Sequence, residues 1–579
     1  MTSTTAETGD PRGVVAVAVD RAAGAAVVRA DGSDVLIEPQ HVARELGEFE
    51  RTERPRWVWW SIDTARTLVD LGVRPARCWD LGAVHRVLHG GWRADPARVW
   101  AASRGLDPAT TPQPAPVDLF TVDEPAGDDP AIRTDGYLTI DWLDGGWATD
   151  TTTLRHHARL ALDVYRRQRE QLGRLTDRPG APSTATSESA AELLSAELEH
   201  DGLPIDVAEA ERIVGSFIGA RPATSDDERR RADDRDDAVL RHLPVELRGD
   251  LDLRSPAGVK SLLRRVGIEV PDTRAWRLEQ LRDEHPVVEA LLQWRRAERI
   301  ATTFGYRWID DHVDDGRLHG SWSGADGAAG RMTATAGLHN LPAELRPAIG
   351  AGPGHVFVRS DLGQIEPRVL AAVSGDAALA SATGDDDMYA PVADRLGVTR
   401  EIAKVAVLGA MYGQTTGRGA EALRGLERAY PTAMRFLTAA DVAAQGGQDL
   451  RTVGGRLVHF DASRSDGADE LAERSRAAAR GRFGRNAMIQ GAAAELFKAW
   501  SVTVRAHLRE QSVGEIVLCL HDELLLHVPE QYGAPTAALV DEALQAAATR
   551  WLRRIASTVD VRFVTDTAVV RRWSDAKDP

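Results

Sequence analysis

A tight turn between two apolar segments constrains the fold of this chain more than any other feature. Residues 516–520 and 524–528 are typical of buried strands, and only His521-Asp522-Glu523 separates them. Such short spacing predicts an antiparallel hairpin with carboxylates at its tip. Residues 355–360 alternate like a further strand and run directly into Asp361. Because a strand end and a hairpin tip can lie side by side in one antiparallel sheet, we expect Asp361 and Asp522 to be neighbours.

Two neighbouring aspartates repel each other unless a cation lies between them. Mg²⁺ suits such a pair, since it binds carboxylate oxygens, retains waters and engages substrate phosphates. Two Mg²⁺ ions, with Mn²⁺ as an alternative, could bind the attacking and leaving oxygens of an in-line phosphoryl transfer. A surface hairpin can also carry Asp and Glu for solubility alone, so the pair by itself leaves both interpretations open.

A helical segment supplies a second pattern. Arg400, Lys404, Leu408 and Tyr412 follow one another at i+4 spacing and so lie along one slowly turning face. Two cations and an aromatic ring on one face suit a nucleoside triphosphate, because charge matches the phosphates and a ring can stack on the base. Lys404 is one of only four lysines in the chain. An ordinary amphipathic helix with a solvated basic edge would show the same spacing.

Together the three segments resemble motifs A, B and C of the family A, or DNA polymerase I-like, DNA polymerases. Motif A usually reads D-x-S-Q-I-E-L-R, and here D-L-G-Q-I-E-P-R runs from Asp361 to Arg368. Motif B usually reads R-x3-K-x7-Y-G, which Arg400, Lys404, Tyr412 and Gly413 match. Motif C reads H-D-E, as at residues 521–523.

Further matches extend the resemblance over roughly residues 191–579. Gly330-Arg331 followed by Asn340-Leu341-Pro342 resembles the primer–template segment of the family. The helix pattern R-x3-N-x3-Q-G is matched by Arg482, Asn486, Gln490 and Gly491, and two shorter matches are Gly455-Arg456 and Trp573.

The resemblance implies a role for each matched residue. Asp361 and Asp522 would bind the metal ions, Lys404 would protonate the departing pyrophosphate, and Glu523 and His521 would support the primer terminus. Glu366 would fill the space that a ribose 2′-hydroxyl needs. The nucleotide-binding residues would be Arg400, Lys404, Tyr412, Glu366, Gln364, Leu408 and Tyr389, and the DNA-binding residues would be Arg331, Asn340, Arg456, Arg482, Asn486, Gln490 and His521.

Some positions depart from the family's pattern. Leu408 stands where an aromatic residue usually stacks on the nucleotide sugar, and Tyr389 stands where many members have a phosphate-contacting His. Leu362, Gly363 and Pro367 alter motif A without removing its acidic groups. Since the carboxylates and both cations are retained, we expect activity, with reduced efficiency.

Residues 1–175 stand where the family has a 3′–5′ proofreading exonuclease, a ribonuclease H-like α/β domain with three carboxylate motifs. Strand patterns at 14–17, 26–28 and 57–60 fit that class. Among the motif positions, Asp20, Asp63, Asp80 and Asp163 are present, but Ala22 replaces a Glu and Arg159 replaces a Tyr. Losing a carboxylate and a water-orienting Tyr weakens metal binding and water activation. We expect a degenerate exonuclease retained as a scaffold.

The resemblance also divides the rest of the chain. An α+β right-hand polymerase domain would span 191–579, with the thumb at about 200–300, the palm at about 318–374 and 486–579, and the fingers at about 375–485. Residues 176–190 have the composition of a linker. Helical periodicity dominates 191–304, and we expect the charge-dense segment 226–237 to form an exposed face. We expect no 5′-nuclease domain, which in the family precedes the exonuclease-type domain.

The charge balance argues against a uniformly basic nucleic-acid binder, since 87 acidic and 71 basic side chains give a net charge of −16. Residues 107–150 contribute ten carboxylates and one arginine. A local basic track is expected instead, from Arg474, Arg476, Arg480, Arg482 and Arg485. The two cysteines exclude a disulfide framework, and no apolar run approaches the ~20 residues of a membrane span. We expect a cytoplasmic, nucleoid-associated monomer that does not bind membranes.

Three functions remain in competition. The favoured one is a template-directed DNA polymerase that uses primer–template DNA and dNTPs, in DNA repair or gap filling. The second is a catalytically weak DNA-binding relative, which would have no need of an intact aspartate pair. The third is a single-subunit RNA polymerase, which Glu366 and the H-D-E turn disfavour.

Overall fold

The computed structural model describes residues 13–112, 128–249, 251–413, 419–461 and 470–576. The chain forms two compact units. The first comprises residues 1–201, 321–334 and 354–569, and the second comprises residues 202–320, 335–353 and 570–579. The middle of the acidic stretch expected at 107–150 lies outside the described residues, because these omit 113–127.

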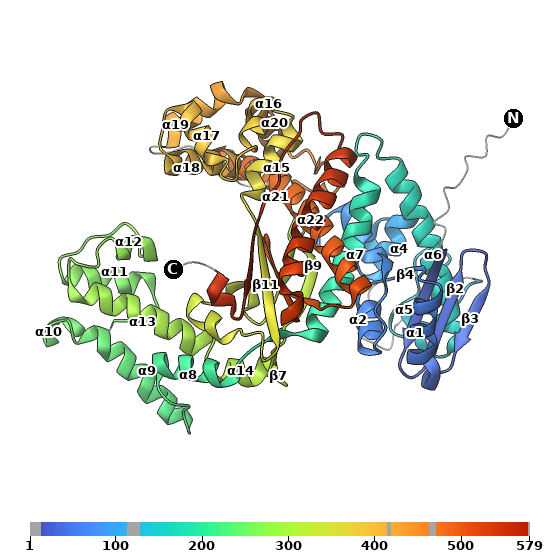
Figure 1. The fold of residues 1–579 in the computed structure, drawn as a ribbon, viewed down its shortest axis with the longest axis horizontal. Coiled ribbons are helices and arrows are strands. Elements are labelled where there is room, and N and C mark those ends of the chain that lie inside the picture. The colour runs from blue at the N-terminus through green and yellow to red at the C-terminus, as the bar shows by residue number, and fades with distance from the viewer. Residues whose placement is uncertain (1–12, 113–127, 250, 414–418, 462–469, 577–579) are drawn as a thin grey trace. The chain divides into compact units, whose positions relative to one another are not determined.

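A five-stranded sheet forms the amino-terminal part of the first unit, with the strand order β3-β2-β1-β4-β5 (Figure 1). Strand β2 pairs antiparallel with β1 and β3, whereas β1, β4 and β5 run parallel. Parallel neighbours need crossover connections, and helix α2 (Ile62–Asp70) supplies the one between β4 and β5. The α/β class expected for this region is confirmed. The strands are β1 (Val14–Asp20), β2 (Gly24–Arg29), β3 (Asp34–Ile37), β4 (Arg56–Trp59) and β5 (Arg77–Asp80).

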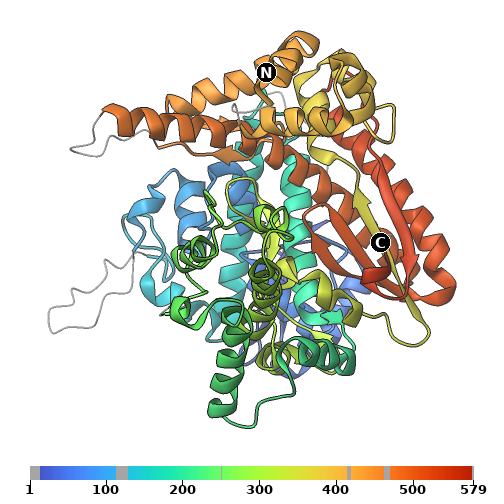
Figure 2. The same ribbon diagram turned by 90° about the vertical axis from the view of Figure 1, so that its left-hand side faces the viewer.

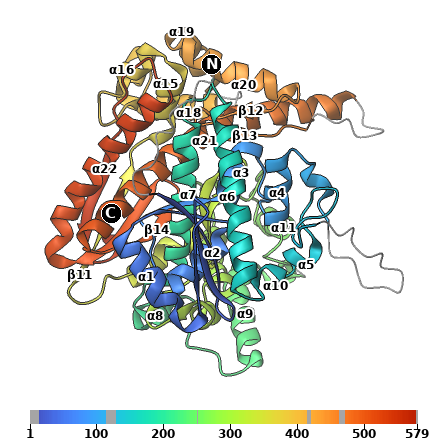
Figure 3. The same cartoon turned by 90° about the vertical axis from the view of Figure 1, so that its right-hand side faces the viewer.

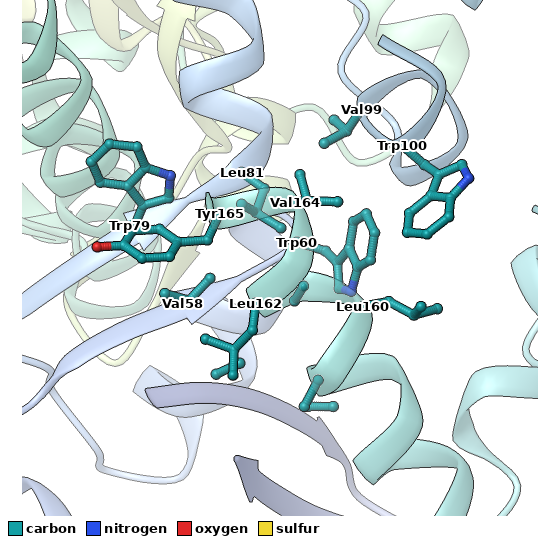
Figure 4. Packing of buried hydrophobic residues seen from close by; sticks show 14 of the residues in the cluster. Val58, Trp60, Trp79, Leu81, Val99, Trp100, Leu160, Leu162, Val164 and Tyr165 are labelled. Atoms are coloured by element: carbon teal, nitrogen blue, oxygen red, sulfur yellow. The ribbon is translucent and has the colours of Figure 1, made fainter. Parts of the chain in front are cut away.

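Each face of this sheet has its own hydrophobic core, because successive strand residues point to opposite faces. On one face, Val17 and Trp57 pack in a core that includes residues of α1 (Val42–Thr52) and α2. On the other face, Ala16 and Val58 pack in a core that includes residues of α3 (Leu81–His89), α4 (Pro96–Arg104) and α6 (Thr151–Gly173). Figure 4 shows the second core, to which the rings of Trp60, Trp79, Trp100 and Tyr165 contribute. The short helix α5 (Ile140–Leu143) adds Trp142 to it.

Helix α7 (Ala181–Asp201) corrects the linker expected at 176–190. Its Ser, Thr and Ala residues are mostly buried, as in Ser189 and Ser195, which are fully inaccessible. The hydroxyls of Ser189 and Ser195 donate to the carbonyls of Ala185 and Ala191, at 2.8 and 3.0 Å. Small side chains that satisfy their hydroxyls within the helix let neighbouring elements approach closely. The composition of a solvated linker therefore belongs to a buried helix that packs against β5 and α21 (Glu470–Gln511).

A second sheet in the same unit has the order β14-β15-β11-β16. Strands β14 (Glu515–Leu520) and β15 (Glu523–Pro529) form the predicted hairpin, and β11 (His355–Leu362) pairs antiparallel with β15. Strand β16 (Thr565–Val570) borders β11, and α22 (Gly533–Arg554) packs on β11 and β15. The predicted sheet and hairpin are confirmed.

Helices between the strands of this sheet gather along α21, as Figure 2 shows for the yellow and orange segments. Helix α17 (Tyr389–Leu396) is followed by Gly397, which adopts the left-handed region at a φ of 65°. Thr399 then caps α18 (Arg400–Tyr412) by accepting from the N–H of Ile402. The remaining helices of this group are α15 (Ile365–Ser374), α16 (Ala377–Ala382), α19 (Gly419–Ala429) and α20 (Pro431–Gln445). Two short antiparallel strand pairs are also present: β9 (Trp322–Asp326) with β10 (Arg331–Ala334), and β12 (Leu450–Arg451) with β13 (Leu457–Val458).

The second unit is mainly helical, as expected, with a core around Leu262, Leu291 and Trp294. In α9 (Ser225–Leu240), the charge-dense segment, Val239 is the one buried residue. No helix among the described residues of either unit is both long and apolar enough to cross a membrane. The remaining elements are α8 (Val207–Ile218), α10 (Val245–Arg248), α11 (Pro256–Arg265), α12 (Ala275–Glu279), α13 (Pro286–Thr303), α14 (Tyr306–His312), β6 (Leu203–Pro204), β7 (Val313–Asp314) and β8 (Arg317–Leu318).

Candidate active site

The two aspartates lie at one edge of the second sheet, as predicted. Asp361 stands opposite Glu523 in the β11–β15 register. The N–H of Leu362 donates to the carbonyl oxygen of Asp522 at 2.9 Å, which joins the strand end directly to the hairpin tip. His521 adopts a positive φ of 56° in the turn. The geometry thus holds both carboxylates close together.

Arg359 holds this edge in place, and the sequence analysis did not identify it. Its buried guanidinium donates to Asp361 at 3.1 Å and, through two nitrogens, to Glu523 at 2.8 and 2.9 Å. It also donates to Asp566 on β16 at 2.8 Å. The sequence pattern that could have revealed Arg359 is a single arginine within an otherwise apolar strand, since a buried cation needs carboxylate partners.

The support of the primer terminus that is expected of Glu523 stays a prediction, and in the structure its side chain lies within the sheet. Only 6% of the residue is exposed, and its carboxylate is engaged by Arg359. It orients Arg359 and, through it, Asp361. The physical reason is the strand register, which places Glu523 directly across from Asp361 within the sheet.

Negative charge converges around Asp522. Burial raises the pKa of its carboxyl, and the neighbouring carboxylates of Glu523 and Glu366 raise that pKa further. A divalent cation would relieve this repulsion. Two aspartate carboxylates are the hard oxygen ligands that Mg²⁺ prefers when waters and phosphates complete its shell. The described residues contain no group of three or more His, Cys, Asp or Glu side chains placed to hold a metal by themselves.

A pocket of about 360 Å³ adjoins Asp522. It brings together residues that lie far apart in sequence: the turn after β11, the face of α18 and the hairpin tip. Asp361 is not part of its wall. The predicted site residues in its wall are Arg331, Gln364, Glu366, Tyr389, Arg400, Lys404, Leu408, Tyr412, His521 and Asp522.

Glu366 links two walls of this pocket. It accepts from Arg331 on β10 at 2.7 Å and from the Tyr412 hydroxyl on α18 at 2.6 Å. Burial, and next the hydrogen bond with Glu366, raise the pKa of Tyr412 to about 12, so its hydroxyl remains a donor at neutral pH. Gln490 on α21 also hydrogen-bonds Tyr412, which connects this predicted DNA-binding residue to the pocket.

Asp387 is a second residue that the sequence analysis missed. It forms an ion pair with Arg400, and its Oδ1 accepts from the Gln364 amide at 2.8 Å. Gln364 in turn accepts from the N–H of Met388 at 2.9 Å, while its own backbone has a left-handed φ of 55°. The Arg400 guanidinium lies 5.9 Å from the centroid of the Tyr389 ring. Asp387 therefore ties the turn after β11 to the start of α18.

Arg368, the last residue of motif A, is fully buried and supports the pocket from behind. Its guanidinium donates to five carbonyl oxygens. Two of these, of Gly363 and Arg562, lie 3.0 and 2.6 Å away. The other three belong to Thr383, Asp385 and Asp386, at 2.7 to 2.8 Å. Burial lowers the pKa of Arg368 to about 10, and no carboxylate is among these acceptors. It fixes the loop that ends in Asp387.

Arg456, which is also predicted to bind DNA, is buried in the first unit. It is only 2% exposed and forms an ion pair with Glu188 on α7. A Cβ at Gly330 would overlap its guanidinium, so Arg456 lies directly behind the β9–β10 turn. Its DNA-binding role stays a prediction, and the sequence pattern did not reveal the buried carboxylate that α7 supplies to it.

The other predicted DNA-binding residues are spread over two units. Arg482 is exposed on α21 against Gly413, and Asn486 is half-buried on the same helix. Asn340 belongs to the second unit, where its carbonyl accepts from Arg299. In the expected basic track, Arg474, Arg476, Arg480 and Arg485 pair with carboxylates of Glu470, Glu473 and Asp441. Its positive charge is therefore largely compensated, which the sequence spacing had not indicated.

The amino-terminal carboxylates are each engaged locally. Asp20 accepts from the N–H groups of Ala22 and Ala23, and Asp163 pairs with Arg104 and Arg167. Asp63 is exposed and pairs with Arg66. Asp80 is buried, caps α3 and accepts from Trp59, and burial raises its pKa to about 6. Arg159 pairs with Asp34.

The chain resembles known proteins over most of its length. The sequence model of DNA polymerase family A matches residues 245–575. DNA polymerase I of Chloroflexus aurantiacus is 32% identical over 304 residues, 46% of this chain and 31% of that protein. Thermostable DNA polymerase I of Thermus filiformis is 29% identical over 335 residues, 52% of this chain and 38% of that protein. The chain thus matches about a third of the length of these relatives.

A solved structure extends the likeness to the whole fold. The POL domain of Pol1 from M. smegmatis, in complex with DNA primer-template and dNTP, superposes with a TM-score of 0.68 at 22% identity. The match covers 97% of this chain and 95% of that domain. The family model covers more than half of the 579 residues and includes the turn after β11, α18 and the hairpin tip. The chain belongs to DNA polymerase family A.

Proposed function

We propose that this chain is a template-directed DNA polymerase, which adds nucleotides from dNTPs to a primer 3′-hydroxyl and releases pyrophosphate. One observation carries the proposal: a single pocket joins Asp522, beside Asp361, to Arg400 and Lys404 on α18. Acidic groups for metal-assisted phosphoryl transfer and cations for a triphosphate are thereby brought together.

The acidic and the basic residues of the site would have different roles. Asp361 and Asp522 would hold Mg²⁺, which when bound supplies a Lewis acid for the transferred phosphoryl group. Arg400 and Lys404 would bind the triphosphate, and the Lys404 ammonium can donate a proton to the departing pyrophosphate. Glu366, fixed between Arg331 and Tyr412, would exclude a ribose 2′-hydroxyl. His521, Arg482, Asn486 and Gln490 would contact primer–template DNA.

Primer extension on a primed template with Mg²⁺ tests the proposal. Extension with dNTPs, and its loss in Asp361→Ala and Asp522→Ala, is the expected result. Asp566→Ala is the matched control, since Asp566 contacts the same Arg359 from an exposed position. Extension that survives both active-site changes contradicts the proposal. DNA binding without extension would support a non-catalytic relative, and extension with rNTPs alone would support an RNA polymerase.

For the amino-terminal α/β part we propose a scaffold derived from a 3′–5′ exonuclease. The local engagement of Asp20 and Asp163, with Arg159 paired to Asp34, supports this. End-labelled single-stranded DNA incubated with Mg²⁺ should remain intact. Shortening from the 3′ end that depends on metal and is abolished by Asp63→Ala would overturn the proposal of a scaffold.

We further propose that the protein acts as a monomer in DNA repair or gap filling.

A further inference from the structure

A basic cavity of about 460 Å³ lies in the first unit, and it shares no residue with the candidate active site. The starts of β4 and β5, the first turns of α7, the middle of α21 and the end of α22 form its wall. Figure 3 shows α7 and α22 near α21, and α21 packs against both helices. Elements far apart in the chain thus enclose one space.

Five arginines line this cavity: Arg56, Arg77, Arg505, Arg550 and Arg554. Arg56 and Arg77 are direct neighbours in the parallel β4–β5 register, and Arg550 and Arg554 are one helical turn apart on α22. Arg505 is compensated by Glu197, to which it donates two hydrogen bonds of 2.6 Å. Arg56 and Arg77 also donate to the carbonyl oxygens of Cys78 and Arg54, at 3.3 and 2.8 Å.

The residues that line the cavity supply many hydrogen-bond donors. None of the described residues that line it is Asp or Glu. The candidate active-site pocket, by contrast, has Glu366 and Asp522 in its wall. Arg550 donates to the hydroxyl of Thr503 at 2.7 Å, and Ser183, Thr186 and Ser187 add further hydroxyls. In a chain of net charge −16, such a wall selects an anion.

The geometry points to a binding site for a polyphosphate anion in this cavity. Guanidinium groups bind phosphate oxygens through paired, charge-assisted hydrogen bonds. A cavity of this volume is larger than a single phosphate needs and falls within the range of small-ligand sites. No aromatic ring lines the wall among the described residues, so nothing there stacks on a base. Recognition therefore rests on the phosphates alone.

Calorimetric titration of the full chain with inorganic tripolyphosphate, at constant ionic strength, tests this site. The background is Arg400→Ala/Lys404→Ala, which removes binding at the candidate active site and separates this test from that of the proposed function. In this background, Arg554→Gln should weaken binding about tenfold or more, the effect of losing one charge-assisted contact. Adding Arg550→Gln should abolish it.

Arg553→Gln is the matched control, because Arg553 is the exposed neighbour of Arg554 on the same helix end but does not line the cavity. It should leave the affinity unchanged. Equal affinity of the Arg554→Gln and Arg553→Gln variants would overturn the site, as would an absence of binding in the background protein. A dATP affinity clearly above that of tripolyphosphate would overturn recognition by phosphate alone. The ligand should also raise the thermal unfolding midpoint, an effect that Arg550→Gln/Arg554→Gln removes.

Discussion

At the scale of single residues, the candidate site depends on side chains that position others. Arg359 orients Asp361 and Glu523, Arg368 fixes a loop through five carbonyls, and Asp387 engages Arg400. None of these three touches the proposed metal ions or acts as an acid or base. Without substrate they hold in place the carboxylates of Asp361 and Glu523, the loop that ends in Asp387, and the Arg400 guanidinium.

Asp387 should compete with the nucleotide for Arg400. We predict that Asp387→Asn lowers the KM for dNTPs by a factor of about two to five, the worth of a solvent-exposed ion pair. Asn keeps the acceptor that Gln364 and the N–H of Tyr389 use, while it loses the charge that holds Arg400. Steady-state primer extension measures the change. Asp385→Asn is the control, and a KM that falls equally in both variants would contradict this role.

At the scale of elements, the turn between β11 and α15 depends on a close approach. The N–H of Gly363 donates to the carbonyl of Val564 at 2.9 Å, and a Cβ at Gly363 would lie 2.8 Å from the Val564 side chain. Real Cβ atoms do not come so close to a stiff, branched neighbour. Motif A of the family usually has a serine at this position. Gly363 allows the turn to approach Val564 closely, which a residue with a Cβ would not.

Gly363→Ala should destabilise the first unit by about 1–3 kcal/mol, because the new methyl group forces Val564 to move. A lower midpoint in thermal unfolding is the expected readout. Val564→Ala removes the obstacle, so the double variant should recover part of the loss, as a double-mutant cycle would show. Additive effects of the two changes would exclude direct contact as the cause.

At the scale of the whole molecule, buried charges connect α7, which packs against β5 of the amino-terminal sheet, to α21 within the first unit. Glu188 on α7 pairs with Lys498 on α21 at 2.6 Å and with Arg456. Glu495, also on α21, accepts from Thr452 and from the N–H of Gly454. Burial raises the pKa of Glu495 to about 7. Such groups make the stability of the unit depend on pH.

Since the pKa of Glu495 is raised in the folded chain, that chain binds an additional proton between the usual pKa of about 4.5 and about 7. The stability that protonated Glu495 contributes is complete below pH 4.5 and is lost as the pH rises through 7. Its slope reaches at most about 1.4 kcal/mol per pH unit for one proton. Glu495→Gln should flatten this part of the profile, measured as urea midpoints from pH 5 to 8. Glu510→Gln, exposed on the same helix, should leave it unchanged, and equal profiles in all three proteins would contradict the assignment.

The distribution of charge should also govern DNA binding. Arg482 is exposed on α21, whereas Arg474 pairs with Glu470. Arg482→Gln should reduce the salt dependence of primer–template affinity by about one unit of logarithmic slope, as expected for one lost phosphate contact. Arg474→Gln should change it less. Fluorescence anisotropy over a range of salt concentrations measures both slopes, and an unchanged slope in the Arg482 variant would exclude the contact.

Local patterns were enough to predict much of this architecture. Alternation and spacing located β11, the β14–β15 hairpin and the amino-terminal strands β1, β2 and β4, because these features depend on residues close in sequence. The same patterns predicted that Asp361 and Asp522 lie at one edge of a sheet. Tyr412, Glu366 and Arg331 were also named as site residues, and the structure places all three in one pocket.

The sequence by itself therefore determined β11, the β14–β15 hairpin and four charged groups of the site, Asp361, Asp522, Arg400 and Lys404. Only the tertiary structure decided which charges are compensated. Arg456 became a buried partner of Glu188, residues 181–190 became a helix rather than a linker, and the basic track was paired with Asp441 and nearby glutamates. It also gathered five arginines around a cavity whose described lining residues include no Asp or Glu. The physical reason is that burial and ion pairing depend on residues hundreds of positions apart, which no local periodicity records.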